Sequence, residues 1–310
     1  MRQAAYVEAH ASGLLAERIE QIWERMTLCR LCPRQCAVDR SQDELGFCQT
    51  GQRPKVASFN AHFGEEDPLV GTRGSGTIFF SHCNLQCLFC QNEDISLRGE
   101  GQEIGPDALA RIMLHLQDQG CHNINLVTPT HVSAHILAAL PLAVEGGLTL
   151  PLVYNCGGYE SVETLKLLDG IIDIYMPDFK FGSSKPADRF CQAADYPERA
   201  KAAIAEMHRQ VGDLVLDDQG LAVRGLLVRH LVLPNGLAGT REVVRFLADL
   251  SPETYLNVMA QYRPCGRAHQ FPEINRRLKS EEHVEAVKWA FSAGLERLDK
   301  RRIFRLARPW

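Results

Sequence analysis

Six short apolar runs recur along the chain after residue 76, and each is followed by a longer amphipathic stretch. The runs are rich in Val, Ile, Leu, Phe and Tyr and are apolar on both faces, which is typical of strands inside a parallel sheet. They predict strands at 77–81, 123–128, 150–155, 171–176, 226–233 and 255–259. The stretches that separate and follow them predict helices at 106–119, 132–145, 161–168, 196–211, 240–250 and 280–293.

Six strand–helix units in a row favour a parallel sheet with helices outside it. Eight units close a barrel, so six predict an open one. We therefore expect an α/β fold in which residues 76–310 form a partial (β/α)6 TIM-like barrel. Residues 1–75 are expected to form a small cysteine-rich module, which begins with an amphipathic helix on the protein surface.

The composition is that of a globular protein: 45% of the 310 residues are hydrophobic, 23% are charged and the formal net charge is −4. There is no basic surplus of the kind that marks nucleic-acid binding, and no nucleic-acid partner is evident. No apolar run reaches the roughly 18 residues that span a membrane. The first 26 residues lack the apolar core of a signal peptide. We expect a cytoplasmic protein without a membrane partner.

Eleven cysteines are many for a chain in a reducing compartment, where disulfides are rare. Seven of them fall in two tight groups, and clustered cysteines there indicate metal ligands before disulfides. The first group consists of Cys29, Cys32, Cys36 and Cys48, and the second consists of Cys83, Cys87 and Cys90.

The second group has the spacing C-x3-C-x2-C and comes directly after the first predicted strand. Three thiolates can hold three irons of a 4Fe–4S cluster and leave the fourth iron without a protein ligand. That iron could bind S-adenosyl-L-methionine (SAM), whose reductive cleavage gives methionine and a 5′-deoxyadenosyl radical. Phe89, which precedes the third cysteine, is suited to pack against the adenine. The alternatives are a three-ligand zinc site and cysteines that only pack.

This motif resembles the cluster loop of the radical SAM superfamily, specifically of proteins related to the pyruvate formate-lyase activating enzyme. The loop is Cys83-Asn-Leu-Gln-Cys-Leu-Phe-Cys-Gln-Asn92. Asp178-Phe-Lys180 is similar to the family's Asp-x-Lys motif, which contacts the cofactor, and the run that begins at Arg229 is similar to its Arg-x-Val-Val-Pro run. The similarity covers about residues 76–265, and the whole chain resembles an activase-like branch with a cysteine-rich N-terminus.

The chain also departs from the family pattern. The second strand ends in Thr-Pro-Thr130-His131, where the superfamily usually has Gly-Gly-Glu, and the third ends in Tyr-Asn155-Cys-Gly instead of an acidic residue before Thr-Asn-Gly. The resemblance implies a barrel of the radical SAM type whose catalytic cluster is held by Cys83, Cys87 and Cys90. The cofactor-binding residues that we expect are Phe89, Asn92, Thr130, His131, Asn155, Asp178, Lys180 and Arg229.

The first cysteine group supplies four thiolates, which is a closed set for a tetrahedral metal or a fully ligated cluster. A structural zinc would stabilise a loop-rich segment that buries little apolar surface. A second 4Fe–4S cluster would instead relay electrons. The spacing indicates a metal and leaves both identities open, and cysteines that bind no metal are the remaining alternative.

In barrel enzymes the chemistry gathers at the C-terminal ends of the strands. Asp178 and Lys180 are two residues apart at such an end, so both should point the same way and serve the cofactor without contributing much to stability. Cys156 and Cys265 should border the same cavity, either as hydrogen-atom donors or as small buried residues. Glu65 and Glu66 precede the first strand, and their default interpretation is a solvated loop.

We therefore expect a radical SAM oxidoreductase that abstracts hydrogen from a substrate, with glycyl-radical installation in a partner protein as the first expectation. The enzyme alternative is radical modification of a small molecule, peptide or RNA. The alternative of another class is a non-catalytic iron–sulfur electron-transfer or sensor protein. The expected partners are a reductant such as flavodoxin or ferredoxin and a protein or peptide substrate.

Overall fold

The computed structural model describes residues 3–299, so residues 300–310 of the predicted 76–310 unit lie outside the described part. The fold is mixed α/β, with one nine-stranded sheet. Its strands are β1 (Lys55–His62), β2 (Ser75–Phe80), β3 (Gln102–Glu103), β4 (Ile124–Val127), β5 (Leu152–Cys156), β6 (Ile174–Pro177), β7 (Val215–Leu216), β8 (Ala222–Leu231) and β9 (Tyr255–Met259).

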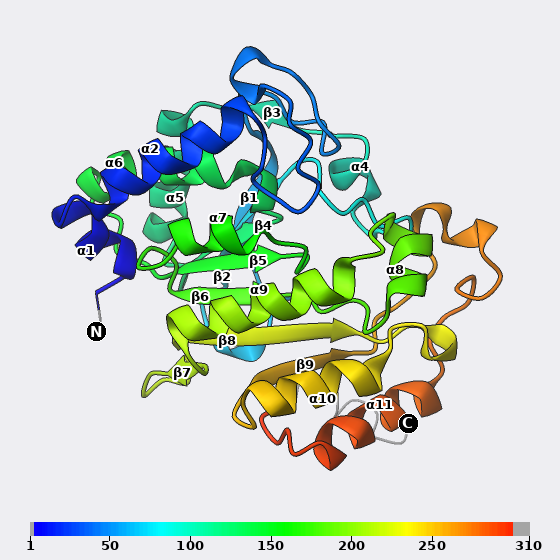
Figure 1. Ribbon diagram of the computed structural model, residues 1–310. Coiled ribbons are helices and arrows are strands. Elements are labelled where there is room, and N and C mark those ends of the chain that lie inside the picture. The colour runs from blue at the N-terminus through cyan, green and yellow to red at the C-terminus, as the bar shows by residue number, and fades with distance from the viewer. Residues whose placement is uncertain (1–2, 300–310) are drawn as a thin grey trace.

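Six of these strands are parallel neighbours in the order in which the chain forms them: β2, β4, β5, β6, β8 and β9. They are the six predicted strands, displaced by at most a few residues, and the parallel sheet is confirmed. The sheet is open, since β2 and β9 do not pair within residues 3–299. All six strands run in one direction, so their carboxyl ends lie along one edge (Figure 1).

The sequence prediction missed β1, β3 and β7, which pair antiparallel with their neighbours. Strand β1 has the sequence KVASFNAH and is partly exposed, so it lacks the apolar run that marks a buried strand. It precedes residue 75 and pairs with β2, so the N-terminal segment contributes a strand to the main sheet. The division of the chain at residue 75 stays a prediction.

The predicted helices are α5 (Pro106–Asp118), α6 (Ser133–Glu145), α7 (Val162–Leu167), α9 (Tyr196–Val211), α10 (Thr240–Leu250) and α11 (Ser280–Ser292). Proline stands at the first position of α5, where its missing N–H costs nothing. Three short helices were not predicted: α3 (Asp67–Val70), α4 (Glu93–Ser96) and α8 (Ser184–Cys191). Helix α8 escaped prediction because its eight residues contain few apolar positions.

The single N-terminal helix that we expected is two helices, α1 (Ala5–Ala11) and α2 (Leu14–Thr27). They meet at Gly13, whose φ of 84° lies in the left-handed region that breaks a helix. Both helices contact α6, and Tyr6 and Ile22 are completely buried. Figure 1 shows α1 and α2 beside α6, so the N-terminal segment packs against the rest of the fold.

Side chains alternate between the two faces of the sheet, and two apolar clusters result. The larger cluster lies between the sheet and the helices and includes Tyr154 and Tyr175. The smaller cluster lies on the opposite face, here called the inner face, and includes Val153 and Met176. Leu69 of α3 belongs to this second cluster, so the connection from β1 to β2 packs against the inner face.

None of the helices within residues 3–299 combines the length and the apolarity that a membrane span requires. The longest of them, α9, has 16 residues and is amphipathic.

Candidate functional site

The three-cysteine loop follows the carboxyl end of β2. Two of its residues, His82 and Gln86, have φ values of 70° and 50°, which turn the backbone sharply. Cys83, Cys87 and Cys90 come close enough for the charge on one thiol to influence the others. The loop therefore brings together the three thiols that the motif predicted, although their role as cluster ligands stays a prediction.

Each outer sulfur of this loop accepts a hydrogen bond. The backbone N–H of Leu85 lies 3.3 Å from Sγ of Cys83, and the hydroxyl of Ser96 lies 3.1 Å from Sγ of Cys90. Burial raises the pKa of the Cys83 thiol to about 12, so metal binding there would release a proton.

Within residues 3–299, no three His, Cys, Asp or Glu side chains form a group that could hold one metal ion. A 4Fe–4S cluster places each thiolate on a separate iron, so its ligands need not meet at one point. Three neighbouring thiols, two of which accept an N–H or O–H hydrogen bond, have the donor chemistry that a cluster requires. The donor set of the loop thus fits a 4Fe–4S cluster.

A fourth cysteine adjoins this loop. Sγ of Cys191, at the end of α8, lies 3.2 Å from Sγ of Cys87. The hydrogen bond from Cys191 lowers the pKa of the Cys87 thiol, and the Lys180 ammonium acts in the same direction. Sequence reasoning did not assign a role to Cys191, because it belongs to neither cysteine group and does not directly follow a predicted strand.

One network of polar side chains lies at the carboxyl ends of β5 and β6 and on β8. It consists of Asn155 on β5, Asp178 and Lys180 just after β6, and Arg229 on β8. Nζ of Lys180 lies 2.5 Å from Oδ2 of Asp178, and Nε of Arg229 lies 2.7 Å from Oδ1. Nη2 of Arg229 also donates to Oδ1 of Asn155 at 2.7 Å. Burial opposes ionisation of Asp178, but the two cations outweigh burial and hold the pKa of its carboxyl below the usual value. The carboxyl group of Asp178 is therefore ionised and compensates both cations.

Glu65 and Glu66 join this network from the connection between β1 and β2. Nη1 of Arg229 lies 3.4 Å from Oε2 of Glu65, and the amide of Asn257 donates to Oε1 of Glu66 at 2.8 Å. The expectation that Glu65 and Glu66 lie in a solvated loop is wrong, because Glu66 is only 4% exposed. Burial and, to a smaller extent, the neighbouring Glu66 raise the pKa of Glu65 to about 7 against the opposing effect of Arg229.

The N-terminal cysteine group lies in the loop that follows α2. Burial raises the pKa of the Cys32 thiol, and Cys29 and Cys48 lie near enough to raise this pKa as well. The sulfur of Cys36 accepts the backbone N–H of Phe47 at 3.3 Å. Three of the four thiols are buried, and that of Cys36 is partly exposed. Whether the group holds a metal stays a prediction.

The two cysteine groups are adjacent, because their loops are hydrogen-bonded to each other. The guanidinium of Arg34, between Cys32 and Cys36, donates to the carbonyls of Asn84 at 3.0 Å and Cys191 at 2.8 Å and also to that of Gln192. It also stacks 3.8 Å from the ring centre of Phe47. The amide of Gln86 donates to the carbonyl of Phe47 at 2.7 Å. Sequence spacing gave no sign of this junction.

No family model matches the sequence. The uncharacterized protein MJ0674 of Methanocaldococcus jannaschii is 33% identical over 301 residues, which cover 94% of this chain and 81% of that protein. The chain belongs to the family of MJ0674. A radical SAM methyltransferase from Sphaerobacter thermophilus has a structure that is similar over 71% of this chain, with a TM-score of 0.49 and 15% sequence identity. This chain matches 64% of the methyltransferase's length, just under two thirds.

Four of the predicted cofactor residues lie outside the Asp178 network. The ring of Phe89 is 6.0–6.3 Å from three other aromatic rings and is 5% exposed. Thr130 donates to the carboxylate of Glu160 at 2.6 Å, and Nε2 of His131 donates to the carbonyl of Ser81 at 2.8 Å. Asn92 is exposed at the start of α4. These contacts do not join the Asp178 network, and a cofactor role for the four residues stays a prediction.

His131 stabilises the start of the three-cysteine loop through a hydrogen bond to the backbone of Ser81. It is 1% exposed, and its hydrogen bond holds Ser81, two residues before Cys83. Burial lowers the pKa of its imidazole to about 3, so the ring is neutral. Its carbonyl accepts Nη1 of the buried Arg40 at 2.7 Å, which ties the N-terminal segment to the same place.

We expected Cys156 to border the same cavity as Asp178, but its side chain does not lie on the inner face of the sheet. Its neighbour Asn155 faces Arg229, so the alternation of the strand turns Cys156 to the opposite, helix-covered face. There the thiol contributes a hydrogen bond to Glu160. Cys265 precedes the segment whose Arg267 N–H donates to the carbonyl of Leu88 at 2.8 Å, so it lies next to the three-cysteine loop.

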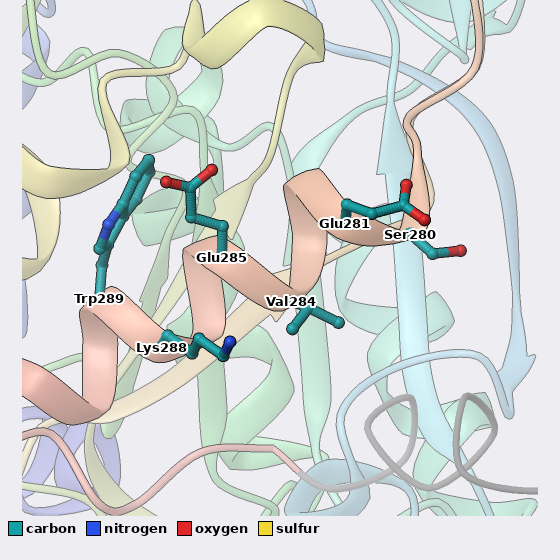
Figure 2. A pocket seen from close by; sticks show the side chains of 6 residues that line it. All are labelled: Ser280, Glu281, Val284, Glu285, Lys288 and Trp289. Carbon is teal, nitrogen blue, oxygen red and sulfur yellow. The ribbon is translucent and has the colours of Figure 1, made fainter.

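Figure 2 shows a separate surface pocket along α11, lined by Ser280, Glu281, Val284, Glu285, Lys288 and Trp289. None of the residues in this lining belongs to the predicted site.

Proposed function

We propose that this protein is a radical SAM enzyme built on a partial (β/α)6 barrel. One observation carries the proposal: the C-x3-C-x2-C loop begins at the carboxyl end of the first of six parallel strands that follow chain order. The Asp178 network lies at the same edge, and Lys180 is close enough to Cys87 for the two charges to interact. Fold and donor set together support this chemistry.

In this proposal Cys83, Cys87 and Cys90 would hold a 4Fe–4S cluster, which when bound supplies the electron that cleaves SAM. The residues of the chain bind and orient. Asp178 keeps the Lys180 ammonium and the Arg229 guanidinium at fixed positions, where such groups suit the carboxylate and ribose of the cofactor. The hydrogen bonds from Leu85 and Ser96 orient the sulfurs of Cys83 and Cys90.

Anaerobic reconstitution with iron and sulfide tests the proposal. The protein should become brown, bleach with dithionite and release 5′-deoxyadenosine from SAM. Replacing Cys83, Cys87 or Cys90 with Ala should abolish this cluster and the cleavage. Cys121→Ala is the matched control, because Cys121 is buried like Cys87 but lies outside both groups.

Full iron content and full SAM cleavage in any of the three variants would contradict the ligand assignment. A cluster that forms without any SAM cleavage would instead favour the electron-transfer or sensor protein. The two results are separated by measuring iron and product in the same sample.

We further propose that the N-terminal group binds either zinc or a second 4Fe–4S cluster. Elemental analysis should give about four irons and one zinc per chain for the first case and about eight irons for the second. Four irons without zinc, after strictly anaerobic handling, would show that these cysteines bind no metal.

For the substrate, the activase resemblance supports glycyl-radical installation in a partner protein, with flavodoxin or ferredoxin as the reductant. Incubation with a glycyl-radical enzyme, SAM and reduced flavodoxin should produce the doublet of a glycyl radical in the electron paramagnetic resonance spectrum. Consumption of a small molecule, peptide or RNA without that signal would favour the alternative substrate classes.

A further inference from the structure

The sulfur atoms of Cys87 and Cys191 lie 3.2 Å apart, although 104 residues separate the two cysteines in the chain. Cys87 is the middle residue of the three-cysteine loop, and Cys191 belongs to neither cysteine group. We propose that Cys191 donates an S–H···S hydrogen bond to Cys87 and so raises the reduction potential of the cluster that Cys87 would bind. This inference rests on the proposed function.

The contact is held in place by the backbone around it. The N–H of Leu88, next to Cys87, donates to the carbonyl of Phe190, next to Cys191, at 3.0 Å. Arg34 fixes the carbonyl of Cys191 from the other side at 2.8 Å. Cys191 is 2% exposed and Cys87 is 8% exposed, so water does not compete for either sulfur. Both thiols are therefore fixed opposite each other by their own segments.

The direction of the hydrogen bond follows from the chemistry of the two sulfurs. A cysteine that binds iron is a thiolate and has no proton to give. The proton in the contact must then come from Cys191, whose thiol is a weak donor. Reduction adds negative charge to a cluster, and hydrogen bonds to its sulfurs favour that charged state. Cys191 is thus a positioning residue that acts through Cys87.

The metal-free protein provides the first test, which is independent of enzyme activity. Treatment with hydrogen peroxide should join Cys87 and Cys191: the S–S bond forms, both S–H bonds break, and the peroxide accepts two electrons and two protons to become two waters. Peptide mapping by mass spectrometry should find this disulfide in clear excess over pairs with Cys83 or Cys90. An even mixture of pairings would overturn the proposed contact.

The reduction potential of the reconstituted protein provides the second test. The electron paramagnetic resonance signal of the barrel cluster is identified as the one that SAM perturbs. A redox titration of this signal then measures the midpoint reduction potential of the cluster. Cys191→Ala should shift the midpoint to a more negative value, whereas Cys191→Ser, which keeps an O–H donor, should stay close to the wild type. Cys121→Ala removes a buried thiol elsewhere and should cause no shift.

An unchanged midpoint in Cys191→Ala, with full iron content, would overturn the inference while the radical SAM assignment stands. Absence of a cluster in the wild-type protein would overturn the proposed function, and the inference with it. If Cys191→Ala fails to fold, Cys191→Val, which also lacks a donor but fills more space, replaces it in the titration.

Discussion

Oδ1 of Asp178 lies 2.7 Å from Nε of Arg229, and the same two residues form a parallel bridge between the end of β6 and strand β8. The second oxygen of Asp178 binds Lys180, and all three side chains are less than 20% exposed. One carboxylate therefore compensates two poorly solvated cations. The expectation that Asp178 contributes little to stability does not agree with these contacts.

Asp178→Asn should lower the free energy of unfolding by about 3–5 kcal/mol, because it removes the carboxylate that binds Lys180 and leaves Arg229 with only the longer contact to Glu65. Thermal unfolding of the metal-free protein measures the loss. Asp107→Asn is the control, since Asp107 forms an exposed pair with Arg111 one helical turn away. Equal melting temperatures for the two variants would show that Asp178 serves only a ligand.

Arg34→Lys should loosen the N-terminal cysteine loop from the three-cysteine loop. A lysine ammonium cannot reproduce the planar fork that reaches three carbonyls and stacks on Phe47. Hydrogen–deuterium exchange should then increase at residues 28–49 and 83–87. Arg30→Lys, at an exposed position of the same loop, should leave exchange unchanged. Equal exchange in both variants would contradict the role of Arg34 at this junction.

The buried imidazole of His230 should make the protein sensitive to acid. Burial lowers its pKa to about 4, while an unfolded histidine titrates near 6.5. The unfolded state therefore takes up a proton first, and stability is lost as the pH falls from about 6.5 to 4. His230→Asn should reduce this loss by up to roughly 3 kcal/mol.

Urea unfolding at pH 7 and pH 4.5 measures the effect of His230→Asn, with the exposed His269→Asn as the control. An identical pH dependence in wild type and His230→Asn would show that other groups, such as His131 and His135, account for the acid sensitivity.

Gly158→Ala should destabilise the protein more than Gly147→Ala. Both glycines have positive φ, 76° and 93°, so both substitutions cost about 1 kcal/mol in backbone strain. A Cβ at Gly158 would also collide with the carbonyl oxygen of Asp178, whereas a Cβ at Gly147 meets nothing within 4 Å. Melting curves should rank the variants accordingly, and equal losses would mean that the Asp178 backbone yields easily.

Local pattern was enough to predict the parallel part of the fold. The six buried strands are largely apolar runs, and the sequences between and after them favour helices, so these elements are marked within their own residues. Strand β1 and helix α8 carry no such signal, because β1 is partly exposed and α8 contains few apolar positions. The spacing of Cys83, Cys87 and Cys90 likewise marked the three-cysteine loop.

The sequence by itself therefore determined the features that neighbouring residues encode, which are the six parallel strands, the six predicted helices and the two cysteine groups. The tertiary structure decided which distant residues meet. It placed Cys191 against Cys87, Arg34 of the N-terminal cysteine loop against Asn84 of the three-cysteine loop, and Glu65 beside Arg229. These contacts depend on how strands and loops stack in space, and no periodicity along the chain encodes a contact between segments that approach only after the sheet has formed.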